Sequence, residues 1–100
     1  MKLQQHTSTL QVSELTELNA TNAGAFREAT RAALTDATTT VDVDLSLTRF
    51  LDSSGLGALI ALQKTLAARS GHVRILRPTA TAQQILELTR LHRVFEIVKT

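Results

Sequence analysis

A strand–helix–strand run in the middle of the chain restricts the possible folds more than any other feature. Apolar and polar residues alternate from Val41 to Leu47, which is typical of a β-strand with one buried face. Apolar residues then recur at helical spacing from Leu56 to Ala67, and a short apolar strand is predicted over Val73–Leu76. Two strands joined by a helical crossover are expected to be parallel neighbours in one sheet.

Further elements are predicted on both sides of this unit. The sequence favours strands over residues 1–6, 10–15 and 94–98, helices over residues 23–37 and from Thr79 or Thr81 onward, and a loop over residues 16–22. Gly71 is predicted to end the central helix in the left-handed conformation, and the spacing of Thr81 and Gln84 suits a capping box. The order predicts an α/β sandwich.

The length and composition indicate one small cytoplasmic domain covering residues 1–100. The chain has no cysteine, which excludes disulfides and suits a reducing compartment. Its N-terminus lacks the apolar run of a signal peptide, and no apolar run approaches the ~18 residues that a membrane span needs. The three histidines, His6, His72 and His92, lack metal-ligand spacing, so we expect no metal and no cofactor.

The charge is unevenly distributed along the chain. Residues 1–60 carry four Lys/Arg against seven acidic residues, whereas residues 61–100 carry seven against two. A basic C-terminal part can indicate nucleic-acid binding. These cations are scattered from Lys64 to Lys99 without interleaved aromatic residues for base stacking, so we expect no nucleic-acid partner.

The segment between the strand and the central helix contains the candidate functional residues. Asp52, Ser53 and Ser54 suit a helix N-cap, and Gly55 and Gly57 follow in the first turn, where each glycine costs about 1 kcal/mol relative to alanine. That cost suggests bare backbone, either for partner approach or for tight packing of the helix.

The same segment argues against an enzyme. Ser53 lacks the Gly-x-Ser-x-Gly elbow of hydrolases, and no His–Asp pair is visibly placed to activate it. Gly55-Leu56-Gly57 is too short to cradle a phosphate, so binding of a nucleotide or small ligand has only the glycine-rich helix start in its favour.

Together these residues resemble a known family. The string Phe50-Leu51-Asp52-Ser53-Ser54-Gly55-Leu56-Gly57, in its strand-to-helix context, is similar to the signature of STAS domains, specifically the bacterial anti-sigma-factor antagonists. The segments Glu17-Leu18-Asn19 and 86–97 resemble the first loop and the closing helix of that family. The resemblance implies a single STAS domain with a mixed four- to five-stranded sheet and about three to four helices, mainly on one face.

The resemblance also implies a regulatory role. In this family the first serine of the pair is phosphorylated by an anti-sigma factor that is an ATP-dependent serine kinase, and a serine phosphatase removes the phosphate. By position Ser53 is the phosphoacceptor, and the partner contacts are assigned to Asn19, Asp52, Ser54, Gly55 and Leu56. The alternative is a STAS subunit that docks on an ABC-type transport or lipid-trafficking ATPase without phosphorylation.

Two positions depart from the family pattern. Asn19 stands where the first loop usually has an aspartate, which removes a carboxylate near the proposed phosphorylation site. Arg90 stands where a glycine is common after the last helix, and is expected to cost turn stability more than function.

Overall fold

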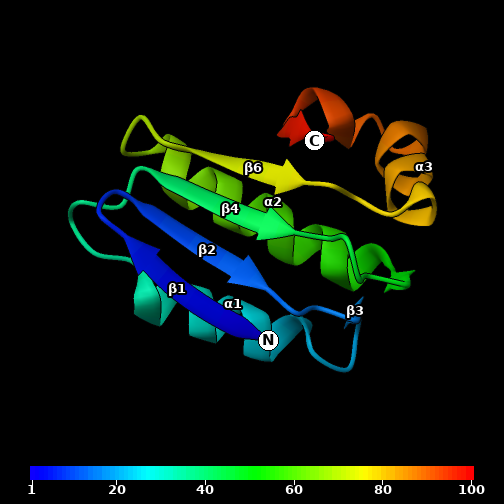
Figure 1. Ribbon diagram of the computed structural model, residues 1–100, viewed down its shortest axis with the longest axis horizontal. Helices are drawn as coiled ribbons and strands as arrows, with labels where there is room; N and C mark the ends of the chain where they lie inside the picture. Colours follow the sequence, from blue (N-terminus) through cyan, green and yellow to red (C-terminus); the bar gives the residue numbers. More distant parts are fainter.

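Two helices cover one face of a five-stranded mixed sheet (Figure 1). The computed structural model describes residues 1–100, with strand order β1-β2-β4-β6-β7. Only β1 runs antiparallel to its neighbour β2; the other pairs are parallel, including β4 and β6 on either side of the central helix. The strands are β1 (Lys2–His6), β2 (Thr9–Ser13), β3 (Glu17–Leu18), β4 (Thr40–Asp44), β5 (Phe50–Leu51), β6 (His72–Leu76) and β7 (Glu96–Val98). The predicted α/β class is therefore confirmed.

The helices are α1 (Ala23–Ala33), α2 (Ser53–Ala67) and α3 (Ala80–Leu88), followed by a 3-10 turn, η1 (Leu91–Arg93). Helices α1 and α2 pack side by side behind the sheet, whereas α3 lies beyond the carboxyl end of β6 (Figure 1). A short parallel pair, β3 and β5, forms a second small sheet. This pair was not predicted, since residues 16–22 were expected to be a loop.

The core lies between the sheet and the helices. Its centre is two rows of paired aliphatic residues, one running from Leu10 through Val41 to Val73 and the other from Val12 through Val43 to Ile75. All six side chains are fully buried. Burial of each such side chain contributes roughly 1.5–3 kcal/mol, so these rows fix the register of the sheet.

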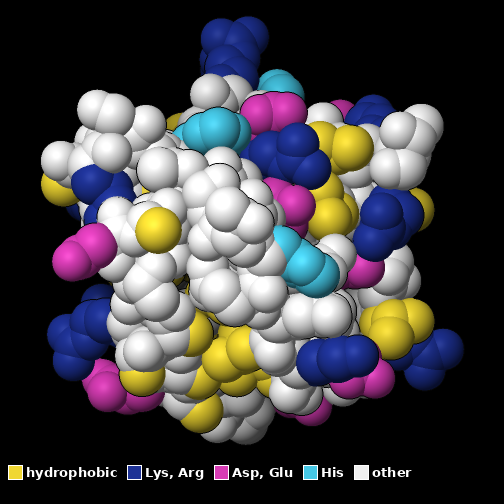
Figure 2. Space-filling model, turned by 60° about the vertical axis from the view of Figure 1, so that its left-hand side comes forward, with side chains coloured by type: hydrophobic (Ala, Val, Ile, Leu, Met, Phe, Trp, Pro, Cys, Tyr) yellow, Lys and Arg dark blue, Asp and Glu magenta, His cyan; other side chains and the backbone are white.

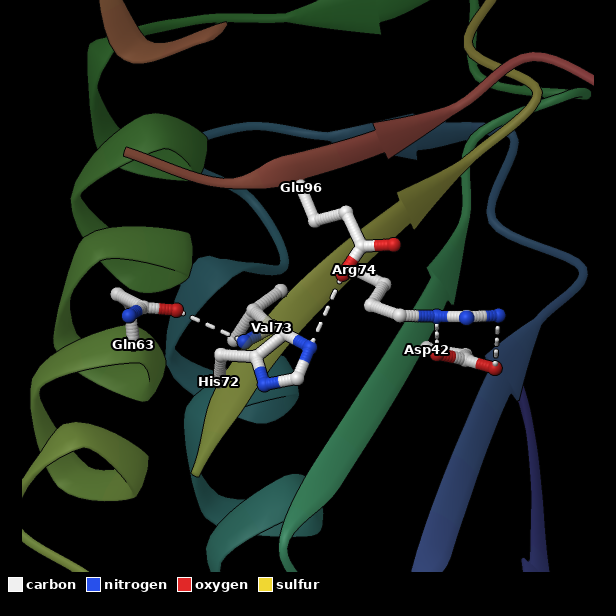
Figure 3. Close-up of polar contacts among 6 residues, drawn as sticks. All are labelled: Asp42, Gln63, His72, Val73, Arg74 and Glu96. Atoms are coloured by element: carbon white, nitrogen blue, oxygen red, sulfur yellow. Dashed lines mark hydrogen bonds and ion pairs between the residues drawn. The ribbon is translucent and has the colours of Figure 1, made fainter. Parts of the chain in front are cut away.

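The opposite face of the sheet is polar, and its charges are paired across strands (Figure 3). Arg74 donates to both carboxylate oxygens of Asp42, at 2.8 and 3.3 Å, and His72 Nε2 lies 3.1 Å from Glu96 Oε1.

Gln63 of α2 accepts the Val73 N–H at 2.8 Å, which satisfies a β6 donor that β7 does not reach. Over the side of the molecule in Figure 2, basic and acidic side chains are intermixed rather than gathered into one basic patch.

Several element ends differ from the sequence predictions. Helix α1 ends at Ala33 instead of residue 37, because Leu34 is extended and the Thr38 hydroxyl accepts the Thr35 N–H in a turn. Strand β4 ends at Asp44, before the exposed Leu47.

The predicted role of Gly71 was wrong. The left-handed residue after α2 is Ser70, at φ 62°, and no glycine in the chain has a positive φ. Gly71 is instead required by close packing, because a Cβ there would clash with the Thr39 carbonyl group.

The last helix begins at the first of its two candidate caps. Thr79 accepts the Ala82 N–H at 3.2 Å, so the capping box of Thr81 and Gln84 is not formed. After α3, Arg90 has φ 61°, which is the conformation that a glycine would adopt without strain. The structure therefore supports the expected cost of Arg90 to the turn.

Candidate functional site

Asp52 organises the start of α2. Its backbone is extended, its Oδ1 accepts the Gly55 N–H at 3.0 Å, and its carbonyl accepts the Leu56 N–H at 2.9 Å. Asp52 is thus the N-cap, and Ser53 is the first helical residue. A carboxylate at this position satisfies an otherwise unpaired donor and complements the positive end of the helix dipole.

The same carboxylate holds the loop before α1. Asp52 Oδ2 accepts the Ala20 N–H at 3.1 Å, which joins two segments 32 residues apart. The β3–β5 pairing runs beside this contact and aligns Leu18 with Leu51. The loop and the start of α2 are therefore positioned together.

The loop is further stabilised by its own side chains. Glu17 Oε2 accepts hydrogen bonds from the Asn19 amide at 2.9 Å and from the Thr21 hydroxyl at 3.1 Å. Asn22 accepts the Asn19 N–H and donates to the Glu17 carbonyl. A carboxylate thus lies beside Asn19 although residue 19 itself is neutral.

The hydrogen bonds to Asp52 predict a specific pH dependence. The Gly55 N–H, with further donors at Ala20 and Ser54, lowers the pKa of Asp52 from its ordinary value of 3.8. A carboxyl whose pKa is lowered by folding stabilises the protein above the unfolded pKa of about 4, and this contribution is lost as the pH falls through the lowered pKa. Asp52→Asn keeps a capping oxygen but cannot ionise. We therefore expect its free energy of unfolding to fall less steeply with decreasing pH than that of the parent.

Urea unfolding from about pH 5 to about pH 2 measures this difference. Asp44 is the control. Burial raises the pKa of Asp44, but hydrogen bonds from Ser46 and Arg77 outweigh burial, so this pKa is also lowered. Because both proteins keep Asp44, its acid-dependent loss of stability is the same in both, and only the difference between their slopes reports on Asp52. Equal slopes for the parent and Asp52→Asn would contradict the assigned role of Asp52.

Ser53 and Ser54 are exposed at the first turn of α2. Neither hydroxyl takes part in a hydrogen bond within the chain, because Asp52 already supplies the cap. The Ser53 oxygen is therefore available to an external group. No imidazole, amine or carboxylate is hydrogen-bonded to it as an activating base.

The residues after the serines face the interior. Gly55 is buried, and a Cβ there would lie 2.7 Å from the carbonyl carbon of Leu18 and closer still to its oxygen. Leu56 is only 8% exposed. Gly57, in contrast, is exposed, and a Cβ added there would have no atom within 4 Å. Gly55 and Leu56 thus hold the helix start against β3, and Gly57 leaves its outer side bare.

A shallow groove of about 390 Å³ runs beside the cap. It joins the β3–α1 loop, the β5 segment and α3, and its lining residues are Asn19, Arg49, Phe50, Leu51, Asp52, Thr81 and Ile85. Two predicted contact residues, Asn19 and Asp52, therefore lie on one surface. No binding role was predicted for Arg49, Thr81 or Ile85, because nothing in the local pattern brings α3 to this site.

A larger groove of about 520 Å³ separates α1 and α2, away from the Asp52 cap. It is lined by Gly24, Arg27, Glu28, Thr30, Arg31, Leu34, Ala58, Ala61, Leu62 and Thr65. No group of three or more His, Cys, Asp or Glu side chains is arranged as a metal site, and none of the helices has the length and apolar character needed to span a bilayer.

A mixed sheet covered by two helices, with Ser53-Ser54-Gly55 at the start of α2, is the arrangement expected of a STAS domain. The comparison with protein families agrees. The family model described as "Mlab, STAS domain" matches residues 1–99. The chain therefore belongs to the STAS domain family. A search of curated protein sequences gave no significant match.

Solved structures show the same fold. An anti-sigma factor antagonist from Mycobacterium paratuberculosis is 27% identical, with a TM-score of 0.84 over 99% of this chain and 84% of its own. A putative antagonist from Thermotoga maritima is 22% identical, with a TM-score of 0.91 over 99% and 86%. Unphosphorylated SpoIIAA is 22% identical, with a TM-score of 0.84 over 97% and 86%.

Two further solved structures share the fold. SpoIIAA of Bacillus has also been solved in a phosphorylated form, at a TM-score of 0.72 to this chain. A more distant match is the murine anion transporter Slc26a9, at 15% identity and a TM-score of 0.73; this chain covers 17% of that protein.

Proposed function

We propose that this protein is an anti-sigma-factor antagonist and acts as a protein-binding switch. It binds a cognate anti-sigma serine kinase while Ser53 is unphosphorylated and releases the kinase once Ser53 carries a phosphate. A serine phosphatase restores the binding form. The observation that carries the proposal is the Ser53 hydroxyl, which is exposed, unbonded within the chain and one residue after a carboxylate cap.

The charge of a phosphate explains how binding would be switched. Phosphoserine adds about −1.5 to −2 charge. At the start of a helix the dipole tolerates this charge, so the fold survives. A partner that covers Ser53 would instead confine the phosphate beside the ionised Asp52. A hundredfold loss of affinity requires only about 2.8 kcal/mol, which a desolvated like-charge contact can supply.

The chemistry of phosphoryl transfer belongs to the kinase. Such transfer needs a bound nucleotide, Mg²⁺ and cationic groups around the γ-phosphate. In this chain Ser53 would be the acceptor, and the remaining residues would supply recognition. This assignment makes the protein a substrate and ligand rather than an enzyme, acting in the cytoplasm where ATP-dependent kinases operate.

A phosphorylation assay tests the proposal. Each serine kinase of the histidine-kinase-like fold from the source genome is purified singly and incubated with ATP and the protein. We expect one of them to place a single phosphate on Ser53, located by peptide mass spectrometry, and none to modify Ser53→Ala. Absence of phosphate on Ser53 with every kinase would contradict the proposal.

The Slc26a9 match suggests a second candidate function, because it is an anion transporter that contains a region of this fold. The chain would then be a STAS subunit that docks on an ABC-type ATPase through the same surface, without phosphorylation. Tight binding to such an ATPase, together with an unmodified Ser53, would select this candidate.

A further inference from the structure

An exposed aromatic side chain lies next to the proposed phosphorylation site. Phe50 is 65% exposed, although it is one of only three phenylalanines and the other two are buried. It forms part of the groove whose other members include Asn19 and Asp52. The exposed ring is therefore continuous with the surface that is proposed to meet the kinase.

Helix α3 provides the opposite wall of the groove. Thr81 and Ile85 line it, and Leu88, which is 76% exposed, follows at the next turn of the same helical face. An apolar side chain inserted between Phe50 and Ile85 would bury apolar surface on both walls. Buried aromatic contacts of this kind are frequent energetic centres of protein interfaces.

The groove contains one cation and one anion, Arg49 and Asp52. Asp52 is negative, but its two oxygens accept N–H groups of Gly55 and Ala20. Arg49 is exposed and has no ion-pair partner, whereas Arg31, Arg74 and Arg77 are all paired with acidic residues. At the Arg49 end, beside Phe50, the groove can therefore pair with a carboxylate that neighbours an apolar side chain.

We propose that this groove, formed by Phe50, Arg49 and the Ile85 face of α3, is a second anchoring site for the kinase. It receives an apolar side chain of the kinase, and Arg49 pairs with an adjacent carboxylate of the same kinase segment. The inference rests on the proposed function, because it assigns the groove to the same partner. It adds a recognition site beside the one at Ser53.

The first test compares two exposed apolar residues by calorimetric titration with the kinase that modifies Ser53. Phe50→Ala is expected to weaken binding at least tenfold. Leu47→Ala is the matched control, since Leu47 is 55% exposed in the same connection but does not line the groove, and it should stay within twofold of the parent. Equal binding by Phe50→Ala and the parent would overturn the groove proposal while leaving Ser53 phosphorylation, and thus the proposed function, in place.

The second test concerns charge. Arg49→Glu is expected to weaken binding at least tenfold at low salt, and the loss should shrink as salt screens the contact. Arg27→Glu, an equivalent change on the exposed face of α1, should have no effect. Equal effects of the two substitutions would show a general charge effect and overturn the assignment of Arg49.

Two measurements on the parent protein, kinase binding and sedimentation, complete the test. A parent that binds none of the kinases would overturn both the groove proposal and the proposed function. Sedimentation of the protein alone is expected to give a monomer. A dimer that Phe50→Ala dissociates would show that a second copy occupies the groove, and would overturn the proposal.

Discussion

Replacing Ser53 by aspartate is expected to weaken the complex with the kinase at least a hundredfold and to leave the fold unchanged. Ser53 is exposed and makes no intrachain hydrogen bond, so no native contact is lost. A carboxylate in the first turn of α2 is compatible with the helix dipole. Inside a complex, however, it would lie next to Asp52 in a surface from which water is excluded, where like charges repel strongly.

Calorimetric titration measures this loss of affinity, and circular dichroism and urea unfolding check the fold. Ser53→Asn is the matched control, because asparagine has nearly the size of aspartate without its charge. It should bind within about tenfold of the parent, a cost of no more than about 1.4 kcal/mol. If the aspartate and asparagine variants bind equally well, charge is not the switch.

The second large effect is expected from Gly55→Ala, which should lower the free energy of unfolding by about 3 kcal/mol or more. The added methyl would meet the backbone of Leu18, which cannot move without disturbing the β3–β5 pair. Overpacking typically costs about 1–3 kcal/mol, and backbone contacts relax less readily than side chains. Urea unfolding measures the change.

Gly57→Ala is the matched control for this substitution. It lies two residues further along the same helix with nothing within 4 Å of its added methyl. Because glycine is a poor helix former, this change should stabilise the protein by about 0.5–1 kcal/mol. Similar unfolding energies for the two alanine variants would show that the packing of Gly55 on Leu18 is not close.

The central unit of the fold was predictable because its pattern is local. The alternating apolar residues Val41, Val43 and Leu45 are all buried in the core, and the helical stripe that follows faces the same core. The short pair β3–β5 was missed because two-residue strands have no period of their own. They form only because Glu17 and Phe50, far apart in the sequence, are brought into register.

The candidate site also has one part that local sequence predicts and another part that depends on tertiary packing. Neighbouring residues predicted an N-cap among Asp52, Ser53 and Ser54, and the structure assigns the cap to Asp52. The contact from Ala20 to Asp52 and the α3 wall of the groove depend on tertiary packing. The sequence could not distinguish the two glycines, because only the tertiary structure shows that Gly55 is buried against Leu18 while Gly57 is exposed.

The most direct measurement is the affinity of one purified protein for its kinase before and after phosphorylation of Ser53. The account predicts tight binding by the unmodified protein, at least a hundredfold weaker binding by the phosphorylated form, and full recovery after treatment with a serine phosphatase. Equal affinity of the two forms for the kinase would contradict it.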